Sequence, residues 1–252
     1  MSLSFRHFPA NKQDRPPVIL LHGFASNSNE DYLSTGWAES LNEGGRSAIT
    51  IDLPAHGSNP PLTSASEAST TATVTAILDT IDTAISLEHK STGFSATGFD
   101  VIGYSLGARL AWELPLVSPH VRRLVLGGLS PTDPFSAVDP TELRGALTGT
   151  TPQSPLVGMM ANLISAPEKD TASLALLIQG LATEPFTPQL ESPTVPTLFV
   201  TGSRDALTQG IDDLAARLPH ASITRVPGDH REALDSPEFR STAIEFLSAQ
   251  HH

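Results

Sequence analysis

The sequence predicts an α/β fold, in which a mostly parallel central sheet of about eight strands is flanked by helices and carries a small helical cap. Short apolar runs alternate with longer segments of helical spacing along most of the chain, and this alternation breaks between Pro131 and Pro193. A length of 252 residues, with 39% hydrophobic and 17% charged residues, suits one globular core with an insertion. We therefore expect a core formed by residues 1–130 and 194–252, with the cap inserted at 131–193.

The strands are predicted from the short apolar runs, which are in chain order Val18–Leu21, Ser47–Ile51, Phe99–Tyr104, Val121–Leu126, Thr197–Thr201 and Ser222–Val226. The core helices are predicted from the segments between these runs, at Gly36–Leu41, Thr71–Leu87, Leu106–Leu116, Ile211–Leu218 and Ser236–Gln250. Because neighbouring parallel strands need a crossover connection, usually a helix, this order of elements favours a parallel sheet.

The cap region is punctuated by prolines and predicts three helices, at Glu142–Leu147, Leu156–Ile164 and Ala172–Leu181. These segments are apolar, and the flexible side chains of Met159 and Met160 are candidates for the lining of a substrate pocket. A helix that packs on a sheet needs an apolar face in any case, so the composition of the cap supports a pocket only weakly.

Composition and charge exclude several classes of protein. The 27 acidic and 15 basic residues give a formal net charge of −12, which repels nucleic acid and anionic membrane surfaces. The absence of cysteine excludes disulfides, thiolate metal sites and a cysteine nucleophile. The chain shows neither the apolar segment of a signal peptide nor the run of about 20 apolar residues that spans a bilayer. We expect a cytoplasmic protein whose partner is a small-molecule substrate.

The segment Gly103-Tyr104-Ser105-Leu106-Gly107 joins a predicted strand to a predicted helix. A nucleophilic serine that projects above a sheet sits on a tight, strained turn, and the residues two before and two after it must lack bulk. Chance alone would give this pattern in roughly one chain in ten of this length. Ser105 is therefore a candidate nucleophile whose assignment depends on partners elsewhere, and Tyr104 beside it is a pocket candidate.

A second turn follows the strand Val18–Leu21, at His22-Gly23-Phe24. Backbone N–H groups at such a turn can stabilise the negative charge that develops on a substrate oxygen, and we expect the N–H groups of Phe24 and Leu106 to form this oxyanion hole. His22 is a pocket candidate, although its position indicates that it fixes the turn by hydrogen bonding rather than taking part in chemistry.

Three segments occur in an order that resembles the α/β-hydrolase superfamily: Leu21-His22-Gly23-Phe24, Asp52-Leu-Pro-Ala-His56-Gly57-Ser58 and Gly103-Tyr-Ser105-Leu-Gly107. The resemblance covers nearly the whole chain outside the cap. It implies that the second segment is a structural loop, so that Asp52, His56 and Gly57 are turn residues. It also implies that an acid and then a histidine follow the serine along the chain.

The candidate acid is Asp205, which follows the strand Thr197–Thr201, and the candidate base is His230, which follows the last strand. A histidine takes the proton of the serine hydroxyl, and a carboxylate orients that histidine. Asp205 also suits an Asx turn or a helix cap. Asp212 and Asp229 are weaker candidates for the acid.

These residues predict a serine hydrolase that cleaves a small, neutral carboxylic ester through an acyl-enzyme, without cofactor or metal. The segment from Gly103 to Arg109 also resembles the menaquinone-pathway synthase that eliminates pyruvate, a carbon–carbon lyase. That family uses a cap tryptophan and several arginines, whereas the basic residues of this cap are Arg144 and Lys169. Arg109 is interpreted as a surface residue that pairs with Glu113. A hydrolase-like binding protein is the third alternative.

Overall fold

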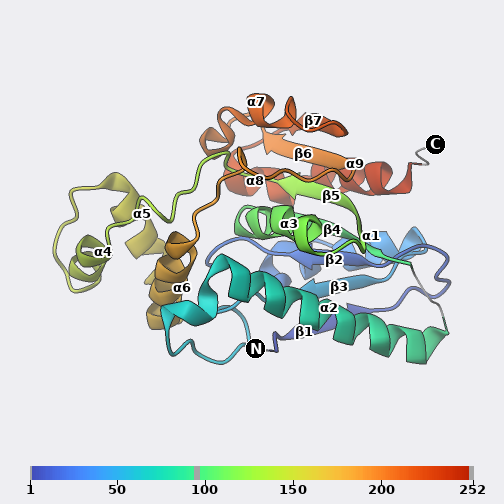
Figure 1. The fold of residues 1–252 in the computed structure, drawn as a ribbon, viewed down its shortest axis with the longest axis horizontal. Coiled ribbons are helices and arrows are strands. Elements are labelled where there is room, and N and C mark those ends of the chain that lie inside the picture. The colour runs from blue at the N-terminus through green and yellow to red at the C-terminus, as the bar shows by residue number, and fades with distance from the viewer. Residues whose placement is uncertain (1, 94–96, 250–252) are drawn as a thin grey trace.

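The computed structural model describes residues 2–93 and 97–249, which form a seven-stranded sheet with helices on both of its faces (Figure 1). The strands are β1 (Phe5–Phe8), β2 (Val18–Leu21), β3 (Ala48–Ile51), β4 (Phe99–Tyr104), β5 (Val121–Gly127), β6 (Thr197–Gly202) and β7 (Ala221–Val226). They lie in the order β1-β3-β2-β4-β5-β6-β7, and only β1 pairs antiparallel with its neighbour. The predicted fold class is confirmed, with seven strands in the described part of the chain rather than about eight.

Strand β1 is absent from the sequence prediction. It is a short edge strand in which Arg6 and His7 interrupt the apolar pattern, and it pairs with β3 in the register Phe5 to Ile51. The predicted helix Ser236–Gln250 is observed as Pro237–Ser248, and Gln250 lies outside the described residues.

The helices of the core are α1 (Trp37–Glu43), α2 (Thr70–Thr92), α3 (Leu106–Val117), α7 (Ile211–Ala215), α8 (His230–Asp235) and α9 (Pro237–Ser248). Buried side chains of α2, α3 and α7 form a core on one face of the sheet, and those of α1, α8 and α9 form a second core on the other face. Three single-turn elements complete the core: a π-helical turn at Asn29–Leu33 and 3₁₀ turns at Ala65–Ala68 and Ala206–Thr208.

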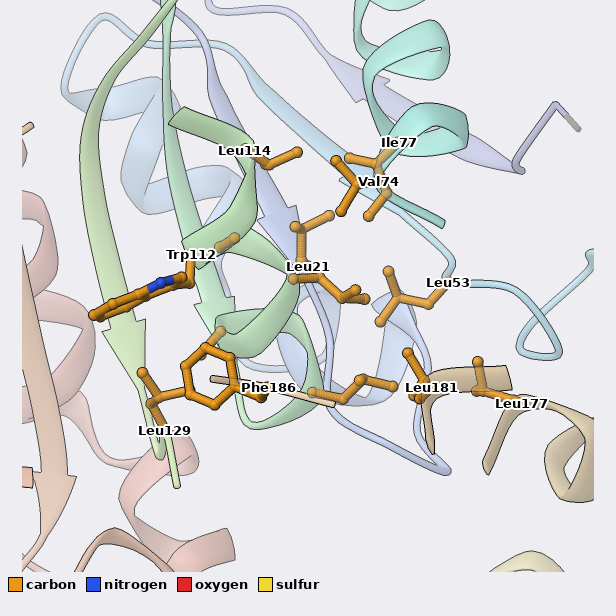
Figure 2. Close-up of a cluster of buried hydrophobic side chains, with 14 of the residues drawn as sticks. Leu21, Leu53, Val74, Ile77, Trp112, Leu114, Leu129, Leu177, Leu181 and Phe186 are labelled. Atoms are coloured by element: carbon orange, nitrogen blue, oxygen red, sulfur yellow. The ribbon is translucent and has the colours of Figure 1, made fainter. Parts of the chain in front are cut away.

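Between β5 and β6 the chain forms three further helices, α4 (Pro140–Leu147), α5 (Pro155–Ile164) and α6 (Thr171–Thr183), which we call the helical insertion. In Figure 1 the insertion extends from one end of the sheet, and α6 lies nearest to the core. Leu177 and Leu181 of α6 belong to the same buried cluster as Leu21, Leu53 and Trp112 of the core (Figure 2). The apolar face of α6 therefore packs against the core.

Helix α4 begins two residues earlier than predicted and helix α5 begins one residue earlier, each at a proline that follows a capping residue. The side chains of Asp139 and Ser154 accept hydrogen bonds from the backbone N–H groups of Glu142 and Val157. Proline suits the first helical position because its missing N–H has no acceptor there in any case.

The register of the central strands places the sequence motifs together. Leu21 of β2 lies opposite both Ile51 of β3 and Gly103 of β4. The segments that follow these three residues therefore leave the sheet side by side, at the carboxyl ends of the strands, where α/β sheets bind their ligands. Among the described residues, no helix has the length and apolar character that crossing a bilayer would demand.

Candidate active site

Ser105 occupies a strained turn between β4 and α3, with φ 52° and ψ −111°. Its N–H donates a hydrogen bond of 2.8 Å to the carbonyl oxygen of Gly127, which holds the turn against β5. A Cβ at Gly103 would lie 2.3 Å from the carbonyl oxygen of Gly107, and one at Gly107 would lie 2.0 Å from that of Leu21. Glycine is required at both positions because the backbone of the turn packs directly on neighbouring backbone.

The candidate acid and base lie within hydrogen-bond distance of each other. Asp205 follows β6, and its Oδ2 lies 2.8 Å from Nδ1 of His230. Its other oxygen, Oδ1, accepts a hydrogen bond of 3.0 Å from the N–H of Leu207 and so caps the short 3₁₀ turn. The geometry therefore accommodates both interpretations of Asp205, as candidate acid and as helix cap, with one oxygen for each.

His230 is the first residue of α8 rather than part of a loop before the last helix. Asp229, a weaker candidate for the acid, is instead the capping residue of α8 and forms a reciprocal capping box with Glu232. This cap fixes the backbone at His230. Asp212, the other weak candidate, is exposed and forms an ion pair with Arg225. The sequence-based order of serine, acid and histidine thus leads to residues that the fold brings to one end of the sheet.

A cavity of about 420 Å³ opens between the sheet and the insertion, and both Ser105 and His230 line it. Its wall is mostly apolar and includes Phe24, Phe135 and, from α5, Leu156, Met159, Met160 and Leu163. Both methionines predicted for a pocket therefore line this cavity. Met160 is buried, whereas the rim residues Met159 and Leu163 are 41% and 43% exposed. The described residues contain no cluster of three or more histidine and carboxylate side chains that could hold a metal ion.

Phe24 and Leu106, the candidate oxyanion-hole residues, both line the cavity. Within the described parts of the chain, neither backbone N–H donates a hydrogen bond to another protein group. Leu106 is the first residue of α3, so its N–H also belongs to the positive end of the helix dipole. Both residues therefore remain candidates for the oxyanion hole.

His22 does not line the cavity, which corrects its assignment as a pocket candidate. It is completely buried beneath the turn, where Nε2 accepts a hydrogen bond of 2.9 Å from the N–H of Leu53, and Nδ1 lies 2.8 Å from the carbonyl oxygen of Gly23. Since Nε2 accepts, Nδ1 carries the proton and donates it. Burial lowers the pKa of His22 against the pull of nearby carboxylates, so the ring is neutral.

His56 has the same role in the neighbouring turn. Its Nε2 accepts a hydrogen bond of 2.9 Å from the N–H of Ala25, and its Nδ1 lies 2.8 Å from the carbonyl oxygen of Pro54. Burial holds the pKa of His56 well below its ordinary value, with the neighbouring His22 acting in the same direction. Ala25 has φ 54°, an unfavourable conformation that this hydrogen bond stabilises directly after Phe24.

Tyr104, another pocket candidate, lines the cavity and contacts the candidate base. Its hydroxyl donates a hydrogen bond of 2.5 Å to the carbonyl oxygen of His230, and the two rings lie 5.4 Å apart. Burial raises the pKa of Tyr104, and Asp205 raises it further, so the phenol stays protonated and continues to donate.

Arg109 differs most from its prediction. It is buried rather than exposed, and its Nη1 lies 3.1 Å from Oδ1 of Asp133, so the expected surface pair with Glu113 is wrong. Its Nη2 donates to the carbonyl oxygens of Leu181 and Glu184, at 3.2 and 2.9 Å. Arg109 therefore binds both ends of the insertion to α3. The whole first half of α3 is buried, so no surface pairing was open to this side chain.

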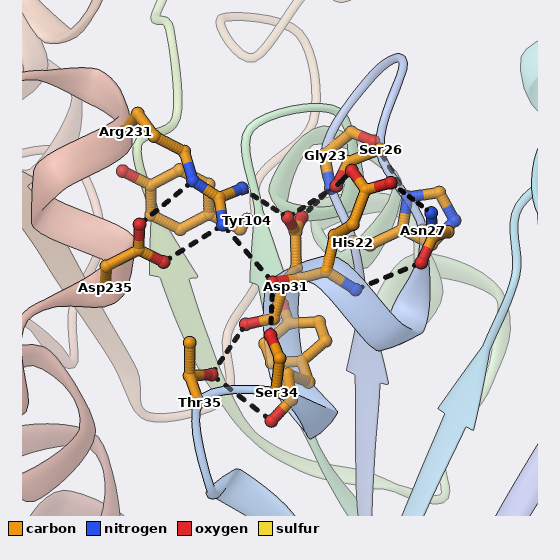
Figure 3. A network of polar contacts seen from close by, with 12 residues as sticks. His22, Gly23, Ser26, Asn27, Asp31, Ser34, Thr35, Tyr104, Arg231 and Asp235 are labelled. Atoms are coloured by element: carbon orange, nitrogen blue, oxygen red, sulfur yellow. Dashed lines mark hydrogen bonds and ion pairs between the residues drawn. The ribbon is translucent and has the colours of Figure 1, made fainter. Parts of the chain in front are cut away.

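Asp31 and Arg231 also line the cavity, and sequence reasoning missed both (Figure 3). Asp31 is 1% exposed and accepts hydrogen bonds of 2.8 Å from the N–H of Gly23 and 2.5 Å from the hydroxyl of Ser26. Nη1 of Arg231 donates to the same carboxylate at 2.6 Å, and the guanidinium also contacts Asp235. The position of Arg231, directly after the candidate base, is the one signal that the sequence offers.

A serine on a strained turn, a histidine paired with a carboxylate and a cavity over the carboxyl ends of parallel strands define the class of α/β enzymes with a nucleophile elbow. The chain belongs to the alpha/beta hydrolase family, whose sequence profile matches residues 18–240.

Solved structures of this fold resemble the chain over nearly its whole length. MenH from S. aureus has a TM-score of 0.73 at 20% identity, with 96% of this chain and 97% of that one covered. An esterase from Exiguobacterium antarcticum has a TM-score of 0.66 at 18% identity, with coverage of 98% and 96%. A putative non-heme bromoperoxidase from Mycobacterium tuberculosis H37Rv has a TM-score of 0.66 at 19% identity, with coverage of 99% and 97%. A comparison with curated proteins finds no match. At these identities the structures establish the fold alone.

Proposed function

We propose that this protein is a serine hydrolase that cleaves a small, neutral carboxylic ester through an acyl-enzyme, with Ser105, His230 and Asp205 as its catalytic triad. The observation that carries the proposal is the hydrogen bond between His230 and Asp205, on a histidine that lines the same cavity as Ser105. A strained serine that shares a cavity with a histidine held by a buried carboxylate supports an activated hydroxyl.

The reaction follows from this geometry. Because Nδ1 of His230 faces Asp205, its Nε2 remains for the proton of Ser105. The Ser105 oxygen attacks the ester carbonyl, and the N–H groups of Phe24 and Leu106 stabilise the resulting oxyanion, each such donor contributing about 2.7–4 kcal/mol. His230 then gives the proton to the departing alcohol, and water, deprotonated by the same histidine, releases the acid.

The charges around the cavity favour a neutral substrate. Of its described lining residues, the two arginines are each paired with a buried carboxylate, Arg109 with Asp133 and Arg231 with Asp31. Neither pair carries a net positive charge that could bind a substrate anion. The rest of the wall is mainly apolar, and methionine side chains adapt to varied acyl or aryl groups.

The same observation weighs against a carbon–carbon lyase that eliminates pyruvate from a polycarboxylate. Such a substrate calls for unpaired cations, and the basic residues of the insertion, Arg144 and Lys169, are not among the residues that line the cavity. Lys169 instead lies 3.5 Å from Glu30. A binding protein without activity would have no use for the strain at Ser105.

The proposal is tested with a fluorophosphonate probe and a panel of short-chain aryl esters, applied to wild type and to Ser105→Ala. We expect wild type to be labelled and to hydrolyse neutral esters, and the variant to do neither. Failure of wild type to be labelled would refute the proposal. Labelling without ester hydrolysis, accompanied by pyruvate release from the menaquinone precursor, would establish the lyase instead.

A further inference from the structure

A buried carboxylate lies beside the turn that carries the Phe24 N–H. The proposed mechanism gives Asp31 no role. Asp31 is nevertheless only 1% exposed, and both of its oxygens contact this turn, Oδ2 at Gly23 and Oδ1 at Ser26. A Cβ at Gly23 would lie 3.6 Å from Oδ2 of Asp31 and 3.6 Å from Cβ of Ser105. The carboxylate and the nucleophile therefore flank the same glycine.

This position creates an electrostatic problem for ester hydrolysis. The tetrahedral intermediate places a negative charge at the Phe24 turn, and an uncompensated carboxylate nearby would repel it, more strongly in a buried site than in water. A buried carboxylate is also costly in itself unless it is paired. An enzyme that uses Asp31 to shape this turn must neutralise it.

Arg231 provides the neutralising charge, and it does so from α8. Its Nη1 lies 2.6 Å from Oδ1 of Asp31, and its Nη2 donates to the carbonyl oxygen of Glu30 at 3.2 Å. The guanidinium is held in turn by Asp235, one turn along α8. Because Arg231 directly follows His230, one side chain connects the oxyanion turn to the helix that begins with the proposed base (Figure 3).

We infer that Asp31 and Arg231 are a positioning pair for the proposed reaction. Asp31 holds the Gly23–Ser26 turn in the conformation that presents the Phe24 N–H, and Arg231 cancels the charge of Asp31 and fastens α8 to that turn. Neither residue touches the reacting atoms. The inference rests on the proposed function, because the pair matters only if an oxyanion forms at Phe24 and His230 moves the proton.

The kinetic test compares Arg231→Met, Arg231→Lys, Asp31→Asn and the double variant Asp31→Asn/Arg231→Met with wild type on a neutral aryl ester. We expect Arg231→Met to lower kcat about 10- to 100-fold with KM changed by less than about threefold, because misplaced catalytic groups cost on this scale. Arg231→Lys should recover most of the loss. The double variant should be more active than Arg231→Met, because it removes the unpaired charge that the single variant leaves behind.

Arg204→Met is the matched control. Arg204 forms an exposed ion pair with Glu232 of α8, the helix that carries Arg231, but Arg204 does not contact Asp31. This variant should therefore keep activity within about twofold of wild type. Equal activities of Arg231→Met and Arg204→Met would overturn the inference. A double variant no more active than Arg231→Met would also overturn it, since that result indicates lost packing rather than unpaired charge.

Hydrogen–deuterium exchange separates failure of this inference from failure of the proposed function. In Arg231→Met, peptides covering residues 22–33 and 228–236 should both exchange faster than in wild type, whereas in Arg204→Met only the second should change. Unchanged exchange at residues 22–33 in Arg231→Met would refute the connection whether or not the wild type hydrolyses esters. A wild type that the fluorophosphonate does not label would instead refute the proposed hydrolase.

Discussion

Replacing Asp205 with asparagine should abolish most activity while leaving the fold intact. The Asp205 side chain is fully buried and divides its oxygens between the N–H of Leu207 and Nδ1 of His230. In Asp205→Asn, the amide oxygen keeps the bond to Leu207 and the amide NH₂ faces the imidazole. His230 must then accept at Nδ1 and carry its proton on Nε2, so it cannot take the proton of Ser105.

The expected loss is about 10⁴-fold in kcat, or about 5.4 kcal/mol of transition-state stabilisation, because the substitution imposes the wrong tautomer. Initial rates of aryl ester hydrolysis measure it, and a thermal melt verifies folding. Asp212→Asn is the control, since Asp212 is an exposed aspartate that forms an ion pair with Arg225, and its loss should leave kcat unchanged. A folded Asp205→Asn variant within tenfold of the wild-type kcat would refute the assignment of Asp205.

Three further predictions concern stability. Ser105→Gly should raise the free energy of unfolding by about 1–2 kcal/mol in urea titrations, because φ of 52° costs serine energy that glycine avoids; a decrease would argue against strain. Arg109→Met should lower the same quantity by about 3–5 kcal/mol, because it leaves Asp133 buried without its cation; a loss below 1 kcal/mol would contradict this. His22 and His56 have lowered pKa values in the folded state, so the unfolded chain binds more protons below the ordinary value of 6.5. The contribution of these two histidines to the free energy of unfolding should therefore be fully present above pH 6.5, and it should fall below that pH by up to about 1.4 kcal/mol per pH unit for each histidine. His56→Gln should remove the contribution of His56 to this pH dependence. An unchanged pH dependence would count against a neutral His56 ring.

Local patterns in the sequence were sufficient to locate six of the seven described strands and to propose the triad. Ser105 follows an apolar strand and has a glycine two residues away on each side, and Asp205 and His230 lie three and four residues after the ends of the last two strands. The parallel register then brings these positions to one end of the sheet without any further information. The early starts of α4 and α5 were also visible in principle, as Asp139-Pro140 and Ser154-Pro155.

Contacts between distant segments were not predictable in this way. Asp31 and Arg231 are separated by 200 positions, and nothing local distinguishes them from other charged residues. The four-residue spacing of Arg109 and Glu113 predicts an exposed pair, but the first half of α3 is buried and Arg109 contacts the end of the insertion. Edge strand β1 is not predicted, because Arg6 and His7 interrupt its apolar pattern. In each case a contact with a distant segment decides the outcome: the Asp31–Arg231 pair, the bonds of Arg109 to the insertion, and the pairing of β1 with β3.

The hydrogen bonds of Arg109 have a consequence for transplanting specificity between relatives of this protein. All three proposed triad residues lie outside the segment between β5 and β6, so a different insertion grafted at this point would bring a new cavity wall to unchanged chemistry. The graft would have to provide the partners that Arg109 has now: a carboxylate at the position of Asp133, and carbonyl oxygens that accept its hydrogen bonds at the positions of Leu181 and Glu184. A chimera that ignores this requirement would leave the guanidinium of Arg109 unpaired in the wall of the cavity that Ser105 also lines.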